Sequence, residues 1–175
     1  MIVGCHFFVK FVLSYRDSIL VDGGYIEGGV YHYYMTDHLG NNRVVVNASG
    51  TVTQRNHYYP FGTAFAENTV DEHKKQPYKY NGKELDQMHG LNLYDYSARY
   101  YESAVGRFTT VDPLAEKYYS ISPYVYVANN PLKYIDPDGM DIYLIGEDGK
   151  ITLALKTEDK HDQLVATKKI NMGIL

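Results

Sequence analysis

The chain has a single cysteine, Cys5, and no tryptophan among its 175 residues. One cysteine excludes an internal disulfide, and no Cys-x-x-Cys pair is present to hold zinc or to act in redox chemistry. A surplus of basic residues is also missing, because the formal net charge is -4 at pH 7. A protein that binds phosphates through a basic surface is therefore disfavoured, and we expect no nucleic-acid partner.

Long hydrophobic runs are also missing. The apolar stretch 2–13 is interrupted by His6 and Lys10 and is too short to span a bilayer. It lacks the basic region and the small-residue cleavage site of a signal peptide. We therefore expect no membrane span, see no signal peptide in this chain, and interpret residues 1–19 as an N-terminal strand or the start of a fragment.

Tyrosine is abundant instead. The chain contains 19 Tyr and 6 Phe, and 45% of its residues are hydrophobic against 22% that are charged, which favours a packed structure over disorder. A tyrosine ring suits a pleated, half-buried surface, with its hydroxyl near water. The composition therefore predicts a mainly β protein in which many tyrosines reach solvent.

Turn residues divide the chain into short strands. Strand-like pieces at 31–36, 43–47 and 51–59 are separated by His-Leu-Gly-Asn-Asn and Ala-Ser-Gly, which predicts a β-meander. A charged stretch at 64–76 is expected to be a surface loop, and 115–119 one or two helical turns. Further strands are expected at 78–84, 91–96, 98–102 and 124–128, followed by a hairpin of 142–145 with 150–156. These loosely repeated units predict antiparallel, tyrosine-rich strands and hairpins with little helix.

Several long motifs occur in a fixed order along the chain. They are DGGYIE (22–27), YHYYMTDHLGNNRVVV (31–46), NHYYPFG (56–62), QPYKYNGKELDQMHGLNLYDYSARYY (76–101) and GRFTTVDPLAEKYYSISPYVYVANNPLKYIDPDGM (106–140). In these motifs the chain resembles the C-terminal end of RHS/YD-repeat proteins, in particular their RHS repeat-associated core domain.

The resemblance implies a β ribbon that spirals into a hollow shell around a polypeptide cargo, as in polymorphic toxins. Residues 20–105 would be YD-repeat-like ribbon, 106–140 the closing segment that ends in DPDGM, and 141–175 a truncated variable extension. The implied partners are the chain's own C-terminal cargo and upstream RHS repeats, with an immunity protein or secretion machinery as further candidates. The implied location is secreted or at the bacterial cell surface.

The same resemblance implies self-cleavage by aspartates just after the DPDGM motif. Mapped onto this chain, the catalytic candidates are Asp112 and Asp136, Arg107 would orient a carboxylate, and the scissile bond joins Met140 to Asp141. Such a core would act once, in cis, as an aspartyl autoprotease. Residue chemistry alone favours a simpler interpretation of Asp136, because Asp-Pro-x-Gly is the composition of a type I turn; Asp112-Pro113 lacks the closing glycine and fits it less well.

Other sites are weaker. The DPDGMD sequence resembles the start of a calcium loop, but its ligand pattern is incomplete, so we expect no metal and no cofactor. His38, Asn47 and His57 suggest a His-Asn-His nuclease but lie on a meander. Four tyrosines would suit sugar stacking: Tyr58, Tyr59, Tyr100 and Tyr101. A non-catalytic surface-binding or structural β module, or an inactive orphan fragment, therefore stays open as an alternative function.

Overall fold

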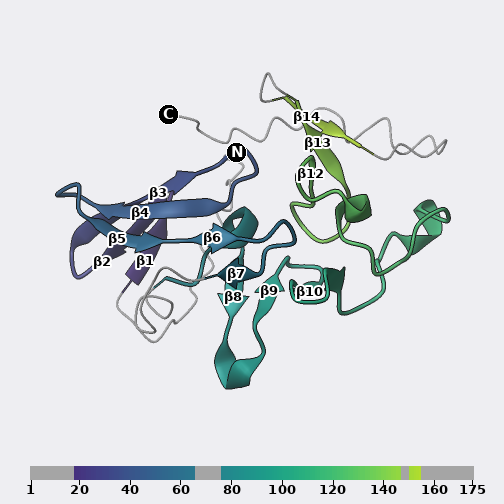
Figure 1. Cartoon of the computed structure of the whole chain (residues 1–175), viewed down its shortest axis with the longest axis horizontal. Helices are drawn as coiled ribbons and strands as arrows, with labels where there is room; N and C mark the ends of the chain where they lie inside the picture. The colour runs from purple at the N-terminus through teal and green to yellow at the C-terminus, as the bar shows by residue number, and fades with distance from the viewer. Residues whose placement is uncertain (1–17, 66–75, 147–149, 155–175) are drawn as a thin grey trace, which may run out of the picture.

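A computed structural model describes residues 18–65, 76–146 and 150–154. These residues form antiparallel strands and short 3-10 turns, with no α-helix among them. Figure 1 shows the strands as a series of small sheets that follow one another along the chain, from the N-terminal sheet in purple and blue to the C-terminal one in yellow-green. The mainly β prediction is confirmed.

The largest sheet is a five-stranded meander with its strands in sequence order. Its strands are β1 (Ser18–Val21), β2 (Gly24–Glu27), β3 (Val30–Thr36), β4 (Asn42–Asn47) and β5 (Val52–Arg55). Turn chemistry fixes the connections. Asn47, for example, accepts the backbone N–H of Ser49 and Thr51 on its side-chain oxygen at 3.0 and 2.9 Å.

Smaller sheets follow. A two-stranded pair joins β6 (His57–Tyr58) to β7 (Ala64–Phe65). A four-stranded sheet contains β8 (Glu84–Asp86), β9 (Leu93–Asp95), β10 (Tyr100–Glu102) and β11 (Arg107–Phe108). A three-stranded sheet contains β12 (Tyr134–Ile135), β13 (Tyr143–Ile145) and β14 (Ile151–Leu153). The 3-10 turns are η2 (Tyr80–Gly82), η3 (Met88–Gly90), η4 (Ala115–Lys117) and η5 (Val127–Asn129).

Two predicted strands are not continuous strands. The segment 124–128 makes a single bridge between Val125 and Arg107 and then turns into η5, where Val127 and Ala128 have φ of 41° and 50°. The segment 78–84 is interrupted by η2, where Asn81 has φ of 49°. A positive φ is incompatible with a strand. The apolar composition of 124–128 does not reveal it, whereas 78–84 contains the turn-forming pair Asn81-Gly82.

Some predictions fall outside the described residues. They concern most of the N-terminal segment 1–19, the greater part of the loop 64–76, the turn of the C-terminal hairpin and residues 155–175. The strands of that hairpin are described, and β13 pairs with β14 as expected. In the part of the chain that the structure describes, no helix is long and apolar enough to cross a membrane.

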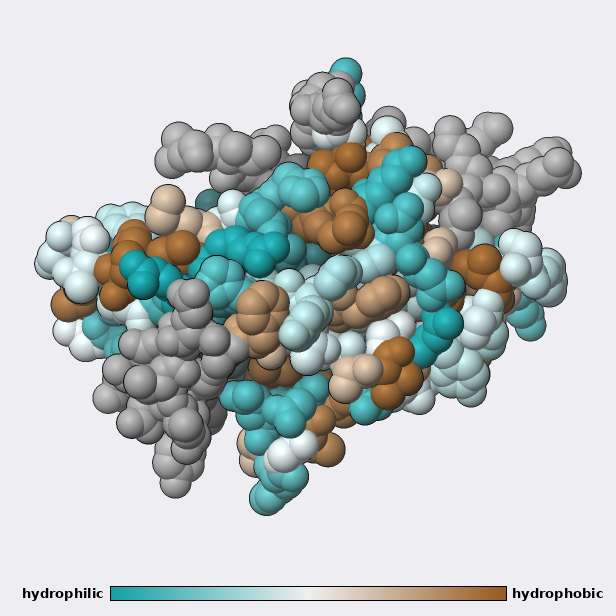
Figure 2. Space-filling view, in the orientation of Figure 1, coloured by the Kyte–Doolittle hydropathy of each residue, from teal (hydrophilic) through white to brown (hydrophobic). Residues whose placement is uncertain are grey.

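The core is a cluster of tyrosines. Its buried members are Tyr58, Tyr80, Tyr94, Tyr96, Tyr101 and Tyr126, with Leu85, Phe108, Val127 and Ile142. The Tyr101 ring lies close to that of Tyr126, with 4.1 Å between centroids and the planes tilted by 33°, and Phe108 meets both rings edge-on at 5.6 and 5.7 Å. Figure 2 shows hydrophilic residues in teal and hydrophobic residues in brown mixed across one face of the molecule.

The hydroxyls of these core tyrosines donate hydrogen bonds within the protein. Tyr80, Tyr101 and Tyr94 donate to the carbonyls of Pro60, Phe61 and Gly62 at 2.8, 2.7 and 3.0 Å. A buried hydroxyl without such a partner would be costly, so the 60–62 turn satisfies three core side chains at once. The expectation that tyrosine hydroxyls reach solvent is therefore wrong for the core.

Candidate functional site

The DPDG motif forms a tight turn around the carboxyl group of Asp136. One oxygen, Oδ1, accepts the backbone N–H of Asp138, Gly139 and Met140 at 3.2, 2.6 and 3.1 Å. Gly139 has φ of +82°, which an L side chain rarely adopts. Asp136 is 1% exposed, so the turn holds a carboxyl group in the interior.

Asp112 also caps a turn. Its Oδ1 accepts the N–H of Leu114 at 2.7 Å, and its backbone carbonyl accepts the N–H of Ala115 at 3.0 Å, where η4 begins. Its backbone N–H donates to Pro123 at 3.0 Å, which brings the chain back beside it. The local role of Asp112 is therefore as clear as that of Asp136, although no glycine closes its turn.

Arg99 joins the two aspartates. Its Nη2 lies 2.9 Å from Oδ2 of Asp112 and 3.6 Å from Oδ2 of Asp136. The guanidinium also donates from Nε to the carbonyl of Gly139 at 2.6 Å and from Nη1 to that of Pro123 at 3.0 Å. The arginine side chain is 2% exposed. The fold thus brings the two carboxyl groups that the sequence singles out to one arginine, which no feature of the sequence points to.

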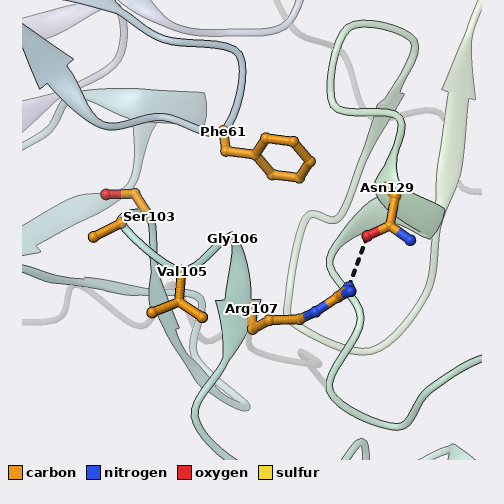
Figure 3. A pocket seen from close by; sticks show the side chains of 7 residues that line it. Phe61, Ser103, Val105, Gly106, Arg107 and Asn129 are labelled. Carbon is orange, nitrogen blue, oxygen red and sulfur yellow. Dashed lines mark hydrogen bonds between the residues drawn. The ribbon is translucent and has the colours of Figure 1, made fainter.

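Arg107 lies elsewhere, so the expectation that it orients a carboxylate is corrected. Its Nη1 donates to Oδ1 of Asn129 at 2.7 Å, as Figure 3 shows. Both residues line a shallow cleft of about 220 Å³, together with Phe61 and the turn 103–106.

Strand alternation explains why Arg107 does not reach the aspartates. Phe108 is 2% exposed and points into the core, so its neighbour Arg107 faces away from the core. Arg99 packs against the same Phe108 ring, with its guanidinium carbon 3.7 Å from the centroid. The apolar Phe108 next to Arg107 is the sequence signal that could have excluded Arg107 as the residue that orients a carboxylate. Nothing comparable in the sequence points to Arg99.

The two carboxyl groups differ in their surroundings. Burial raises the pKa of Asp136 to about 7, although the N–H of Gly139 and the charge of Arg99 oppose this rise. Burial also raises the pKa of Asp112 above its ordinary value, against the N–H of Leu114 and the charge of Arg99. Asp112 is the more exposed of the two, at 12% against 1% for the side chains. Asp136 is therefore the group that more readily holds a proton near neutral pH.

The bond between Met140 and Asp141 lies directly after the DPDG turn. The Met140 N–H is shared between the carboxyl groups of Asp136 and Asp138 at 3.1 and 3.2 Å. On the other side of the bond, the hydroxyl of Tyr118 donates to the Asp141 carboxylate. Ile142 is then buried in the core. Both sides of this bond are thus held in place by side chains.

The weaker candidate sites are dispersed or occupied by structural contacts. The Asp136 carboxyl accepts N–H groups and faces Arg99, an arrangement for an acceptor rather than for a cation ligand. No metal-binding group of His, Cys, Asp and Glu occurs among the described residues. Asn47 caps its own turn, and His57 packs on Phe65 with 5.7 Å between centroids.

The four tyrosines proposed for sugar stacking do not form one face. Tyr58 and Tyr101 are buried at 8% and 0% exposure, whereas Tyr59 and Tyr100 are exposed at 58% and 46%. Successive residues of a strand point to opposite sides, which separates Tyr100 from Tyr101 in β10. Tyr59 directly follows the end of β6. The expected stacking platform is therefore absent in these residues.

Comparison with solved structures defines the class of protein. The fold is similar to that in the crystal structure of TcdB2-TccC3-Cdc42, with a TM-score of 0.59 and 25% sequence identity over 70% of this chain and 6% of that chain. The class is a mainly β fold of the YD-shell type. Residues 25–132 match the family described as Teneurin YD-shell, and the chain belongs to this family.

Curated relatives include a surface protein and a toxin subunit. The chain is 35% identical over 116 residues to Salivary gland surface protein 1 of Aedes aegypti, which covers 66% of this chain and 3% of the relative. It is 37% identical over 97 residues to Toxin subunit YenC2 of Yersinia entomophaga, which covers 54% of this chain and 10% of the relative. The chain thus spans a small fraction of the length of these relatives.

Proposed function

We propose that this chain is the RHS repeat-associated core of a polymorphic toxin or surface protein, and that it cleaves itself once between Met140 and Asp141. The observation that carries this proposal is the shared contact of Asp112 and Asp136 with Arg99. Its partners would be the upstream repeats of the shell and the C-terminal segment, with an immunity protein or secretion machinery beyond them. Its location would be outside the producing cell or on its surface.

The chemistry needs one neutral and one ionised carboxyl group. Two neighbouring aspartates cannot readily both ionise, and a buried one keeps its proton more easily. Asp136, with its raised pKa, is the better proton holder, and Asp112, paired with Arg99 at 2.9 Å, is the better base.

In the proposed reaction, ionised Asp112 takes a proton from a water molecule whose oxygen attacks the carbonyl carbon of Met140. Neutral Asp136 donates a hydrogen bond to the carbonyl oxygen. The bond from the Met140 carbon to the Asp141 nitrogen breaks, and the proton taken from water passes to that nitrogen. The second proton of the water moves from the new carboxyl group to the amine, so the products are a carboxylate on Met140 and an ammonium group on Asp141.

Intact-mass measurement under denaturing conditions tests the proposal. The full-length chain, incubated for days between pH 4 and 8, is expected to lose residues 141–175 in one step. Asp112→Asn and Asp136→Asn should each abolish the loss. Asp86→Asn is a matched control, because Asp86 caps the turn at Met88 in the same way, at 2.8 Å, without contacting Arg99. A wild-type chain that keeps its full mass would refute self-cleavage.

A non-catalytic role in the shell is the second candidate. It is favoured by the turn-capping contacts of both aspartates, which account for their burial without any reaction. Under this alternative the Asp112→Asn and Asp136→Asn variants lose stability, and no chain of lower mass forms from any of the proteins.

A further inference from the structure

Lys83 reaches the DPDG turn from a distant part of the chain. It directly precedes β8, and its Nζ donates to the carbonyl of Pro137 at 2.5 Å. The ammonium also lies 5.2 Å from the centroid of the Tyr96 ring, a side chain with no exposed surface. Lys83 is itself partly buried. A lysine held in this way is fixed in position, unlike a solvated surface lysine.

The charged groups around Lys83 are mostly acidic. Burial lowers the pKa of Lys83, although Asp136 and Asp138 of the turn and Asp95 of β9 oppose this by favouring its charged form. Asp136 in turn faces Arg99 and Asp138. The turn therefore has two cations with different tasks. Arg99 contacts the carboxyl groups of Asp112 and Asp136. Lys83 contacts the Pro137 carbonyl, in the backbone that leads from Asp136 to the predicted scissile bond.

We propose that Lys83 is a positioning residue for the cleavage proposed above. By holding the Pro137 carbonyl it fixes the turn that presents Met140 to Asp136. Its positive charge has the opposite tendency, because it acts against the neutral form of Asp136 that the proposed reaction uses. The inference rests on the proposed function for its catalytic consequence. Its electrostatic consequence concerns Asp136 alone and is measurable in a chain that does not cleave.

Three substitutions separate the two tasks of Lys83. Lys83→Arg keeps both the charge and the donor, Lys83→Gln keeps a donor without the charge, and Lys83→Met removes both. Lys133→Gln is the matched control, because Lys133 also lies over a tyrosine ring, with 5.5 Å to the Tyr134 centroid, but is exposed. The urea midpoint of each variant identifies any that fails to fold.

The first measurement is the titration of the Asp136 side-chain carboxyl by NMR in the Asp112→Asn background, where cleavage is blocked. Lys83→Gln and Lys83→Met should move its midpoint to higher pH, since a nearby positive charge is lost. Lys83→Arg and Lys133→Gln should leave the midpoint unchanged. An unchanged midpoint in both Lys83→Gln and Lys83→Met would overturn the electrostatic role.

The second measurement is the pH dependence of the cleavage rate, with Asp112 intact. Lys83→Met is expected to reduce the rate by about tenfold or more, as misplacement of a reacting group does, and Lys83→Arg to restore it. The cleavage rate of Lys83→Gln should be higher than that of Lys83→Met. The pH dependence of that rate should shift together with the titration midpoint of Asp136. Equal rates in Lys83→Met and Lys133→Gln would overturn the positioning role. Absence of cleavage in the wild type would refute the proposed function, while the NMR titration still decides the electrostatic part.

Discussion

Arg99 donates from its Nε to the carbonyl of Gly139 at 2.6 Å, so the arginine that contacts both aspartates is also bonded to the turn that precedes the predicted scissile bond. The approach is close. A Cβ added at Gly139 would lie 3.2 Å from the backbone nitrogen of Arg99 and 3.3 Å from the Cβ of Tyr96. Glycine at this position is required both by its positive φ and by its neighbours.

Gly139→Ala should therefore destabilise the chain more than an alanine placed where only the positive φ, and no close neighbour, opposes a side chain. Gly50→Ala is the control, since Gly50 has φ of +79° with nothing within 4 Å of an added Cβ. We expect about 1 kcal/mol for Gly50→Ala from the left-handed conformation. Gly139→Ala should cost about 1–3 kcal/mol more, the usual range for crowding in a packed region. Urea denaturation measures both, and equal losses would contradict the close packing of Arg99 on this turn.

The two arginines of the motifs should behave differently when their charge is removed. Arg99→Gln leaves Asp112 and Asp136 without their buried cation and should cost about 3 kcal/mol, as loss of one partner in a buried ion pair does. Arg107→Gln removes a single exposed hydrogen bond to Asn129 and should cost less than about 1 kcal/mol. The urea midpoints of the two variants provide the comparison. An Arg107 variant that is the less stable of the two would contradict the assignment of Arg99 to the carboxyl groups.

How far the sequence predicts this molecule depends on how local each feature is. The strands around Asn47 follow from turn chemistry, which depends on a few adjacent residues, and they are confirmed. The contact between Arg99 and Asp136 depends on the packing of segments far apart in the chain, and no spacing rule reports it. Arg107 is nearer to Asp112 in sequence, but strand alternation turns it away from the core that Phe108 enters.

The tyrosines show the same limit. Their number predicts β structure correctly, because an aromatic ring suits a pleated surface. Their hydroxyls find partners on the turn 60–62, which only the fold brings within reach. Composition alone therefore assigns these groups to water, whereas the structure assigns them to backbone carbonyls.

The stability of the chain should fall as pH rises from about 4 to 7. Burial raises the pKa of Asp136 from 3.8 to about 7 in the folded protein. The unfolded chain releases this proton first, so the stabilisation is complete below the unfolded pKa and is lost as pH rises through the folded pKa. One proton corresponds to a slope of about 1.4 kcal/mol per pH unit at most.

Asp136→Asn should flatten this part of the pH profile. An asparagine keeps a side-chain oxygen that can accept the N–H of Gly139, but it does not titrate. Urea denaturation at a series of pH values in the Asp136→Asn and Asp86→Asn variants measures the change. Asp86→Asn should retain the wild-type slope. An equally steep profile in Asp136→Asn would show that the proton is held elsewhere.

The tyrosine cluster contains one polar centre whose removal should be costly. The hydroxyls of Tyr96 and Tyr126 lie 3.0 Å apart, and both contact Oδ1 of Asn81, at 2.8 and 2.6 Å. Both tyrosines have no exposed surface. Tyr126→Phe should therefore cost about 1–2 kcal/mol, because a buried group loses its hydrogen-bond partner. Tyr119→Phe is the control, since Tyr119 is 87% exposed and its change should stay within about 0.5 kcal/mol.

A double-mutant cycle tests whether the two hydroxyls act together. If they share Asn81, the free energies of unfolding lost in Tyr96→Phe and Tyr126→Phe should not add up in the double variant. We expect a coupling of about 0.5 kcal/mol or more, because the pair is in direct contact within one hydrogen-bond network. Strict additivity would mean that each hydroxyl is satisfied independently. The network at Asn81 would then contribute no cooperative stabilisation to the core, and the ring contacts of the tyrosines would account for its packing.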